Sequence, residues 1–264
     1  MFYELFASIT TSCPPYVRHM DYLHEAIALR GRYLRNKVSW EPHLERSRRS
    51  VLSAAGKCES REKVVVLGAG LLLDVPLEEL SSLFREVVLV DIVFLPEVRE
   101  KIQRLSNVKL VQHDVTNVAH ALYDNIQQGG RELPAAAPNV PGIDDTTGLV
   151  VSLNILSQLW VMPRAYALKK MRGLDEEQVN EWCLEITGAH YAYLRSLSCA
   201  VCLIADHEFV KRDREGRALI QGSTIANLAL PEPDTTWIWN IIPKGDARHY
   251  LSKELKVGAW YALR

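Results

Sequence analysis

The sequence predicts a single α/β domain built on a mostly parallel sheet with helices on both of its faces. Three observations lead to this prediction. From residue 63 onward, short apolar runs alternate with helical patterns, as in successive βαβ units. A glycine turn, Gly68-Ala-Gly70, directly follows the first apolar run. The chain closes with two β-rich runs, 235–242 and 255–263, and their short connection predicts an antiparallel pair at the sheet edge.

Five apolar runs form the expected parallel strands. They are residues 63–67, 86–90, 108–111, 148–153 and 199–204. Each ends close to a polar or acidic residue, and strands of such sheets place ligand groups at their carboxyl ends. The stretch between the third and fourth runs is rich in Gly, Pro, Ala and Asp, and we expect a surface loop there. A helix is expected from about Asp175, its N-cap, to Leu197.

Helices are also expected ahead of the sheet. Pro14-Pro15 opens one predicted helix and Trp40-Glu41-Pro42 opens a second, with the polar, basic residues 35–39 as a link between them. Residues 1–15 have neither the basic start nor the unbroken apolar stretch of a signal peptide. The five cysteines are odd in number and form no CxxC pair. We therefore expect a cytoplasmic protein with reduced thiols.

The composition is that of one globular domain. The chain has 264 residues, 48% of them hydrophobic and 24% charged, which is enough to bury one substantial core. Lysine and arginine together number 31, against 32 for aspartate and glutamate, so no strong field of either sign favours nucleic acid or an anionic membrane. No apolar run approaches the roughly 20 residues that span a bilayer. We expect a soluble protein with neither nucleic-acid nor membrane partners.

The turn after the first strand is the most informative segment. Glycines at positions 68 and 70 let a ligand approach the backbone with no Cβ in the way. Asp74 is expected to cap the following helix, with Pro76 in its first turn. Leu73 stands where a dinucleotide-binding turn would have its third glycine, which argues against an NAD site.

Acidic residues follow the second and third strands. Asp91 comes about 20 residues after the turn, where a carboxylate accepts hydrogen bonds from both ribose hydroxyls of an adenosine; the alternative is a solvated loop aspartate. Asp114 can accept from an adenine amino group, with Val115 as an apolar contact, or it can cap a turn. Together with the glycine turn, these acids indicate an adenosine-containing cofactor.

In this order, the first strand, the GxG turn and the two acids resemble the class I S-adenosylmethionine-dependent methyltransferases. The resemblance covers about residues 63–204, and the final β-pair is similar to the family's antiparallel tail. It implies a Rossmann-like, mixed seven-stranded sheet, S-adenosylmethionine as cofactor, and methyl transfer to an acceptor that we expect to be a small molecule. It also implies an N-terminal helical cap or lid, residues 1–60, on a methyltransferase domain, residues 61–264. The oligomeric state has no signature in the sequence.

The resemblance implies site residues by position. The glycine turn would meet the methionine part of the cofactor, the acid after the second strand the ribose, and the acid after the third strand the adenine. The usual acid before the first glycine is absent, and Asp74 or an N-terminal residue is the expected replacement. The implied cofactor residues are Gly68, Gly70, Asp74, Asp91, Ile92, Asp114, Val115 and Asn154. The lid residues best placed to reach the cofactor are Tyr16, Arg32, Tyr33 and Arg35.

Two residues are candidates for catalysis. Asn154 follows the fourth strand, where the family has groups near the reacting methyl. His207 follows the fifth strand and could take a proton from an acceptor hydroxyl or amine, or it could be a hydrogen-bonded loop histidine. The histidines show no metal-binding spacing, so no metal is expected.

Three other functions remain open at this point. The same cofactor could donate an aminoalkyl arm in place of its methyl group. A non-catalytic binding or scaffold protein of this fold would have the leucines at 71–73 filling the cleft. A nucleotide-dependent dehydrogenase is disfavoured by the missing third glycine and by the antiparallel C-terminal pair.

Overall fold

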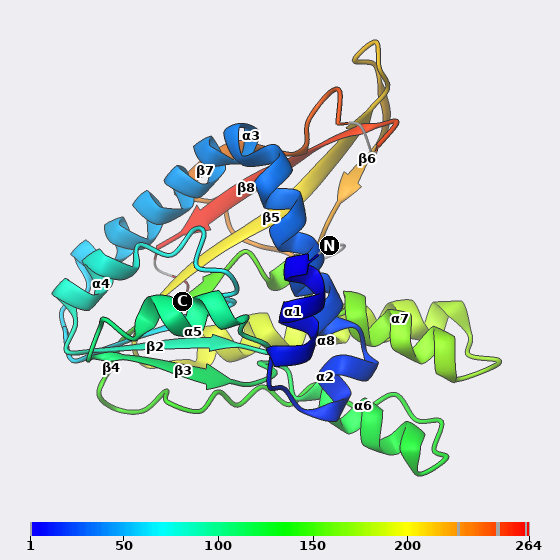
Figure 1. The fold of residues 1–264 in the computed structure, drawn as a ribbon, viewed down its shortest axis with the longest axis horizontal. Helices are drawn as coiled ribbons and strands as arrows, with labels where there is room; N and C mark the ends of the chain where they lie inside the picture. The colour runs from blue at the N-terminus through cyan, green and yellow to red at the C-terminus, as the bar shows by residue number, and fades with distance from the viewer. Residues whose placement is uncertain (1, 226–227, 247–248, 262, 264) are drawn as a thin grey trace.

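The computed structural model describes residues 2–225, 228–246, 249–261 and 263. Its centre is one eight-stranded sheet (Figure 1). The strands are β1 (Lys63–Leu67), β2 (Glu86–Asp91), β3 (Val108–Gln112), β4 (Thr147–Leu153), β5 (Ala200–Arg212), β6 (Ala218–Ser223), β7 (Thr235–Ile242) and β8 (Ser252–Trp260). Their order is β3-β2-β1-β4-β5-β8-β7, and β6 pairs with the second half of β5.

The sheet has the mixed direction that the sequence predicts. Strands β1 to β5 run parallel to one another, and β8 runs antiparallel to both β5 and β7. From β1 the chain builds outward through β2 to β3, then returns to the other side of β1 for β4 and β5. This reversal between β1 and β4 is the topological switch point at which open α/β sheets bind ligands. The predicted Rossmann-like fold is therefore confirmed.

One strand was not predicted. The seven-stranded sheet expected from the sequence has an eighth strand because β5 continues past residue 204 and forms a hairpin with β6. Every residue of β6 is exposed. Without a buried face the segment has no alternation of apolar and polar residues, which is the pattern that marks a strand in a sequence.

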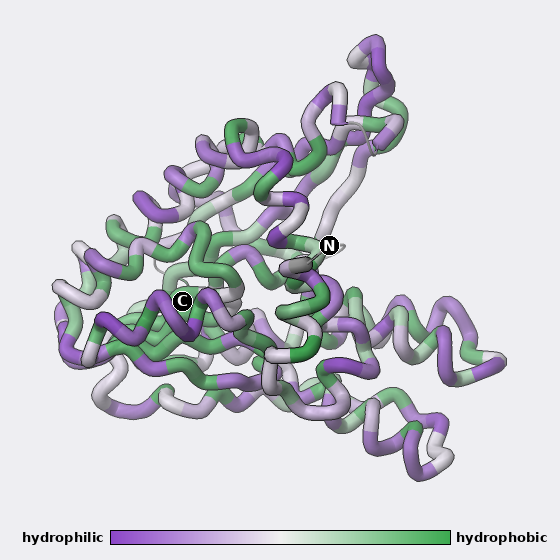
Figure 2. Tube along the Cα trace, viewed as in Figure 1, coloured by the Kyte–Doolittle hydropathy of each residue, from purple (hydrophilic) through white to green (hydrophobic). Residues whose placement is uncertain are grey.

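Helices cover both faces of the sheet. They are α1 (Phe2–Thr10), α2 (Pro15–His19), α3 (Tyr22–Lys57), α4 (Leu77–Leu83), α5 (Pro96–Ile102), α6 (Val118–Gln127), α7 (Val161–Lys170) and α8 (Glu176–Ser196), with a short 3-10 turn η1 (Leu156–Gln158). Side chains of α3, α4 and α5 pack on one face, and α8 contributes to the cluster on the other. Figure 2 shows the hydrophobic colour gathered in the strands between these layers.

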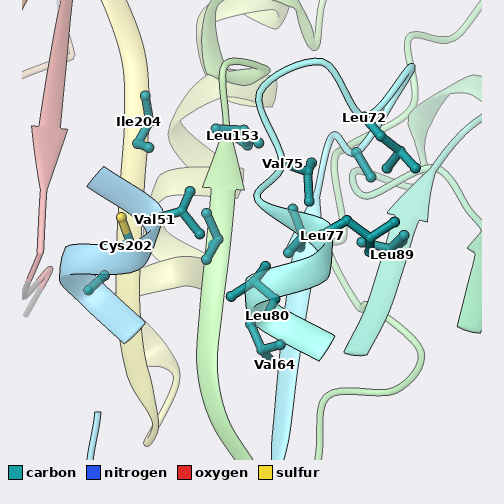
Figure 3. Close-up of a cluster of buried hydrophobic side chains, with 14 of the residues drawn as sticks. Val51, Val64, Leu72, Val75, Leu77, Leu80, Leu89, Leu153, Cys202 and Ile204 are labelled. Carbon is teal, nitrogen blue, oxygen red and sulfur yellow. The ribbon is translucent and has the colours of Figure 1, made fainter. Parts of the chain in front are cut away.

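Successive residues of each central strand point to opposite faces. Val64 and Val66 lie in the cluster under α3 and α4, whereas Val65 and Leu67 lie in the opposite one. All five residues of β1 are buried, as expected for a strand covered on both sides. Figure 3 shows part of the first cluster, in which Val51 of α3 and Leu80 of α4 meet the sheet. Burial on both faces holds the carboxyl end of β1 in place.

The N-terminal helices differ from the prediction. In place of two helices divided at residues 35–39, the structure has the short α2 and a 36-residue α3 that continues through this segment, with a kink at Asn36 (φ −112°, ψ 17°). Arg35 and Lys37 are exposed, while Asn36 and Trp40 are buried. The polar run thus lies within a continuous helix, with most of its side chains in solvent and Asn36 buried. Helix α1 was not predicted.

Of the two predicted helix caps, Asp175 is present and Asp74 is not. Asp175 caps α8 as expected, since its carboxylate accepts a hydrogen bond from the backbone N of Gln178 at 3.4 Å. Asp74 does not cap α4, whose N-cap position is occupied by Pro76 without a side-chain hydrogen bond. The Asp74 carboxylate instead accepts from Asn154 Nδ2 at 2.8 Å. That long-range partner has no signature in the local sequence.

Candidate functional site

A pocket of about 410 Å³ lies at the carboxyl ends of the parallel strands. Its walls come from the segments that follow β1, β2, β3 and β4, and from α3 between Tyr22 and Leu44. Trp239 of β7 adds one further side chain. The pocket therefore occupies the switch point of the sheet, and α3 forms its wall on one side.

The residues that the sequence proposed for a cofactor all line this pocket. They are Gly68, Gly70, Asp74, Asp91, Ile92, Asp114, Val115 and Asn154. They come from four segments far apart in the sequence, and the parallel strands bring those segments to one edge of the sheet. The structure thus places them together around one cavity.

The two glycines of the turn are required for different reasons. Gly68 has φ +83°, and a Cβ there would lie 2.2 Å from Ile155 Cγ2 and 2.8 Å from the Leu153 carbonyl oxygen. Gly70 has φ +45°, but a Cβ there would meet nothing closer than Asp91 Oδ2 at 3.7 Å. Gly68 is therefore needed for packing against the segment after β4, whereas Gly70 leaves open space beside a carboxylate.

The leucines after the turn do not fill the pocket. Leu72 has φ +58° and is buried in the hydrophobic cluster, close to Val75 and Leu77 (Figure 3). Leu71 and Leu73 line the pocket as part of its apolar wall. A filled cleft was the expected sign of a scaffold protein, and the pocket keeps its volume of about 410 Å³ with these side chains in place.

Asp91 is held by the turn that it faces. Its Oδ2 accepts a hydrogen bond from the Gly70 backbone N at 2.8 Å, and its Oδ1 accepts a longer one, 3.4 Å, from the Val93 backbone N. Burial raises the pKa of this carboxyl to about 6, with the nearby Asp74 charge adding to the rise and the backbone hydrogen bonds opposing it. A group that donates hydrogen bonds to Asp91 would stabilise its charged form.

Asp114 caps a turn while also facing the pocket. Its Oδ1 accepts from the backbone N and the hydroxyl of Thr116, at 2.9 and 2.7 Å, and its Oδ2 accepts from the backbone N of Ala119 at 2.7 Å. These bonds fix the start of α6. A carboxylate has about four acceptor positions, so one remains for a ligand. Both roles foreseen for Asp114 are therefore compatible.

Asp74 and Asn154 form a polar pair across the pocket floor. Asn154 has φ +54°, and its backbone N donates to the Ile204 carbonyl at 2.8 Å, which fixes the start of the segment after β4. Burial raises the pKa of Asp74 to about 6, and the hydrogen bond from Asn154 opposes the rise. This pair supplies acceptor groups next to the glycine turn.

His207 lies outside the set of residues that line this pocket. Its ring packs edge-on against Trp260, with 6.0 Å between ring centroids, and its Nδ1 lies 3.6 Å from Glu208 Oε1. Burial lowers its pKa, and the neighbouring Glu208 charge opposes the shift. The polar cluster that follows residue 204 in the sequence is part of the long β5 and not a loop at the pocket.

No family model matches the sequence, and no curated protein sequence matches it. Among solved structures, the DhpI–SAH complex is 14% identical over 88% of this chain and 93% of that chain, with a TM-score of 0.36. The 23S rRNA methyltransferase ErmE is 14% identical over 80% of this chain and 67% of that chain, with a TM-score of 0.29.

A third similar structure is the Burkholderia thailandensis 1,6-didemethyltoxoflavin-N1-methyltransferase with bound 1,6-didemethyltoxoflavin and S-adenosylhomocysteine. It is 13% identical over 90% of this chain and 89% of that chain, with a TM-score of 0.35. These TM-scores are low. The fold assignment therefore rests on the strand order of the chain itself, and the site on its own residues.

Sequence reasoning missed the aromatic part of the pocket. Trp40 and His43 of α3 and Trp239 of β7 line it, and the His43 and Trp239 rings stack with 3.9 Å between centroids and an interplanar angle of 4°. Of the predicted lid residues, Arg32 lines the pocket, where it pairs with Glu25. Tyr16 lies outside the lining and stacks on His120.

Two further properties concern the described part of the chain. None of its helices combines the length and the apolar character needed to cross a membrane. Within the same residues, no three or more His, Cys, Asp or Glu side chains are grouped as metal ligands would be.

Proposed function

We propose that this chain is an S-adenosylmethionine-dependent methyltransferase that acts on a small-molecule acceptor. The observation that supports this most is the meeting of a glycine turn and two separate acids, Asp91 and Asp114, in one pocket at the switch point of the sheet. Each was proposed from the sequence alone for a different part of one cofactor.

The residues present fit such a cofactor. The open space beside Gly70 lets a cofactor approach the backbone, and the Asp91 carboxylate beside it can accept from two adjacent hydroxyls. Asp114 has one acceptor position free, and Val115 offers an apolar contact to a purine ring. S-adenosylmethionine, when bound, would supply a methyl group already activated by the sulfonium. The protein would then act mainly by holding the acceptor in line with that methyl.

The remaining wall supports a small and partly apolar acceptor. Leu159, Val161 and Met162 line the pocket after β4, and the Glu25–Arg32 ion pair lies on the α3 side. The almost neutral chain has no excess of basic residues with which to hold a nucleic acid. Residues 1–60 fit the proposed lid, because α3 forms one wall of the pocket.

The proposal is tested by calorimetric titration of the purified chain with S-adenosylmethionine, S-adenosylhomocysteine and NADH. We expect micromolar binding of the first two and none of NADH. Asp91→Ala should weaken both by at least tenfold, since a hydrogen bond to a charged group contributes about 1.5–3 kcal/mol. Asp145→Ala, which removes an exposed loop carboxylate, is the matched control and should bind like the wild type. Folded wild-type protein that binds neither adenosyl compound would refute the proposal.

A further inference from the structure

The polar corner of the pocket, formed by Asp74, Asn154 and His43, contains a buried acceptor, Asn154 Oδ1, that has no hydrogen-bond partner among the described residues. All three residues line the cavity. They come from the loop after β1, the segment after β4 and helix α3, respectively. The roles proposed above for Asp91 and Asp114 do not involve this corner, so its chemistry can be considered separately.

His43 is fixed as a hydrogen-bond donor toward the pocket. Its Nδ1 lies 3.0 Å from Trp237 Nε1, and an indole N–H can only donate, so Nδ1 must carry the lone pair. Burial lowers the pKa of His43 to about 3, and the ring is therefore neutral at ordinary pH. The single ring proton then resides on Nε2. Stacking on Trp239 holds the plane of the ring.

The orientation of the Asn154 amide is also fixed. Its Nδ2 lies 2.8 Å from Asp74 Oδ2, and because an ionised carboxylate only accepts, the amide nitrogen must face it. Asn154 Oδ1 is buried, and in the described residues it has no hydrogen-bond partner. Buried acceptors of this kind are costly unless a ligand satisfies them.

Asn154 does not satisfy His43 either. Asn154 Nδ2 lies 3.5 Å from His43 Nε2, and with the assignments above both atoms carry hydrogen, so neither can accept a hydrogen bond from the other. The corner thus offers two acceptors, the Asp74 carboxylate and Asn154 Oδ1, next to one donor, the His43 Nε2–H. Arg48 adds positive charge on the same side, where its Nη1 donates to the Leu73 carbonyl at 2.6 Å.

We propose that this corner binds an α-amino-acid group, with its ammonium on Asp74 and Asn154 and its carboxylate on His43. An ammonium has three donors and no acceptor, and a carboxylate has the reverse, which matches the two sides of the corner. The inference rests on the proposed function, because the ligand that presents this group is the amino-acid tail of S-adenosylmethionine. Asp74, Asn154 and His43 would then replace the acid that is missing before Gly68.

The test compares two ligands that differ only in the tail. S-adenosylhomocysteine carries the amino-acid group, whereas 5′-methylthioadenosine has the same nucleoside and thioether without it. We expect Asp74→Asn to lower the affinity for S-adenosylhomocysteine by about tenfold to a hundredfold, the effect of losing hydrogen bonds to a charged partner, and to leave the affinity for 5′-methylthioadenosine unchanged. Asp91→Asn, the matched control at the ribose, should weaken both ligands equally.

A second measurement covers the possibility that Asp74→Asn disturbs folding. Correlation of histidine ring nitrogens with their carbon-bound protons by NMR should show wild-type His43 as the neutral tautomer protonated on Nε2. His43→Phe, which keeps a ring against Trp239, should lower the affinity for S-adenosylhomocysteine alone. A neutral His43 protonated on Nδ1 would overturn the proposal.

The outcomes separate this inference from the proposed function. If both ligands bind the wild type but Asp74→Asn leaves the ratio of their affinities unchanged, the tail does not lie in the polar corner, and the inference fails while the cofactor site stands. The same unchanged ratio would result if the corner served an amino-acid acceptor, and it overturns the assignment to the cofactor equally. If neither ligand binds the wild type, the proposed function fails as well.

Discussion

Asp91→Asn should gain stability relative to the wild type as the pH rises from 5 to 8, while it weakens ligand binding. Asp91 is buried beside the glycine turn, and its pKa rises from 3.8 to about 6 in the folded chain, chiefly through desolvation. A raised folded pKa means that ionisation is easier in the unfolded chain. The stability associated with the neutral carboxyl is complete below pH 3.8 and is lost as pH rises through 6.

The size of the effect follows from the shift. A difference of about 2 pKa units corresponds to a loss of up to about 3 kcal/mol at pH 8 relative to very low pH. Between pH 5 and pH 8 the same relation gives a loss of wild-type stability of about 1.5 kcal/mol. Asparagine is uncharged and can still accept from the Gly70 backbone N. The stability of Asp91→Asn relative to the wild type should therefore increase by about 1.5 kcal/mol over this interval.

Urea denaturation of both proteins at pH 5, 6.5 and 8 measures this difference, and contributions from other groups largely cancel in the comparison. Asp114→Asn is the matched control, because the Asp114 carboxylate accepts three hydrogen bonds that hold the start of α6. That substitution should destabilise the protein at pH 8. If the stability of Asp91→Asn relative to the wild type stays constant or falls as the pH rises, the reasoning is refuted. Asp91 would then not be a buried carboxylate whose ionisation destabilises the folded chain.

Three further predictions concern stability and thiol reactivity. Gly70→Ala should cost about 1–2 kcal/mol for its positive φ alone, whereas Gly68→Ala should cost about 3 kcal/mol or more because its Cβ would also collide with the segment after β4; equal melting temperatures for the two would contradict this. His190 is fully buried, and burial lowers its pKa to about 4. Between pH 7 and pH 5 the unfolded histidine takes up a proton before the folded one, so the wild type should lose about 2 kcal/mol more stability than His190→Leu. Identical changes of the urea midpoint in the two proteins would contradict this. Of the five thiols, only Cys13 and Cys199 are partly accessible, and a thiol reagent should modify these two before the chain unfolds; rapid modification of all five would show that the core is open.

The elements that the sequence predicted best are those whose burial is uniform. Strand β1 is buried along its whole length and is followed by glycine, so the run Val64-Val-Val-Leu67 could be placed without tertiary information. Strand β6 is exposed throughout and could not. The C-terminal pair was predicted because β7 is rich in β-branched and aromatic residues and a short connection separates it from a second β-rich run.

The residues of the site likewise include some that could be predicted from the sequence and some that could not. Gly68, Asp91 and Asp114 could be proposed because each follows a recognisable strand at a typical spacing. The polar corner could not, because it depends on pairs such as His43 with Trp237, which are 194 residues apart in the sequence. Asp74 shows the limit most clearly. Locally it has the sequence of a helix cap, and only the fold brings it to Asn154.

The most direct measurement is a crystal structure of the chain with S-adenosylhomocysteine. We expect the ribose hydroxyls on the Asp91 carboxylate and the adenine between Asp114 and Val115, in the pocket under α3. Electron density for the ligand at any other place on the molecule, or an empty pocket at saturating ligand, would contradict the claim that this edge of the sheet is the cofactor site.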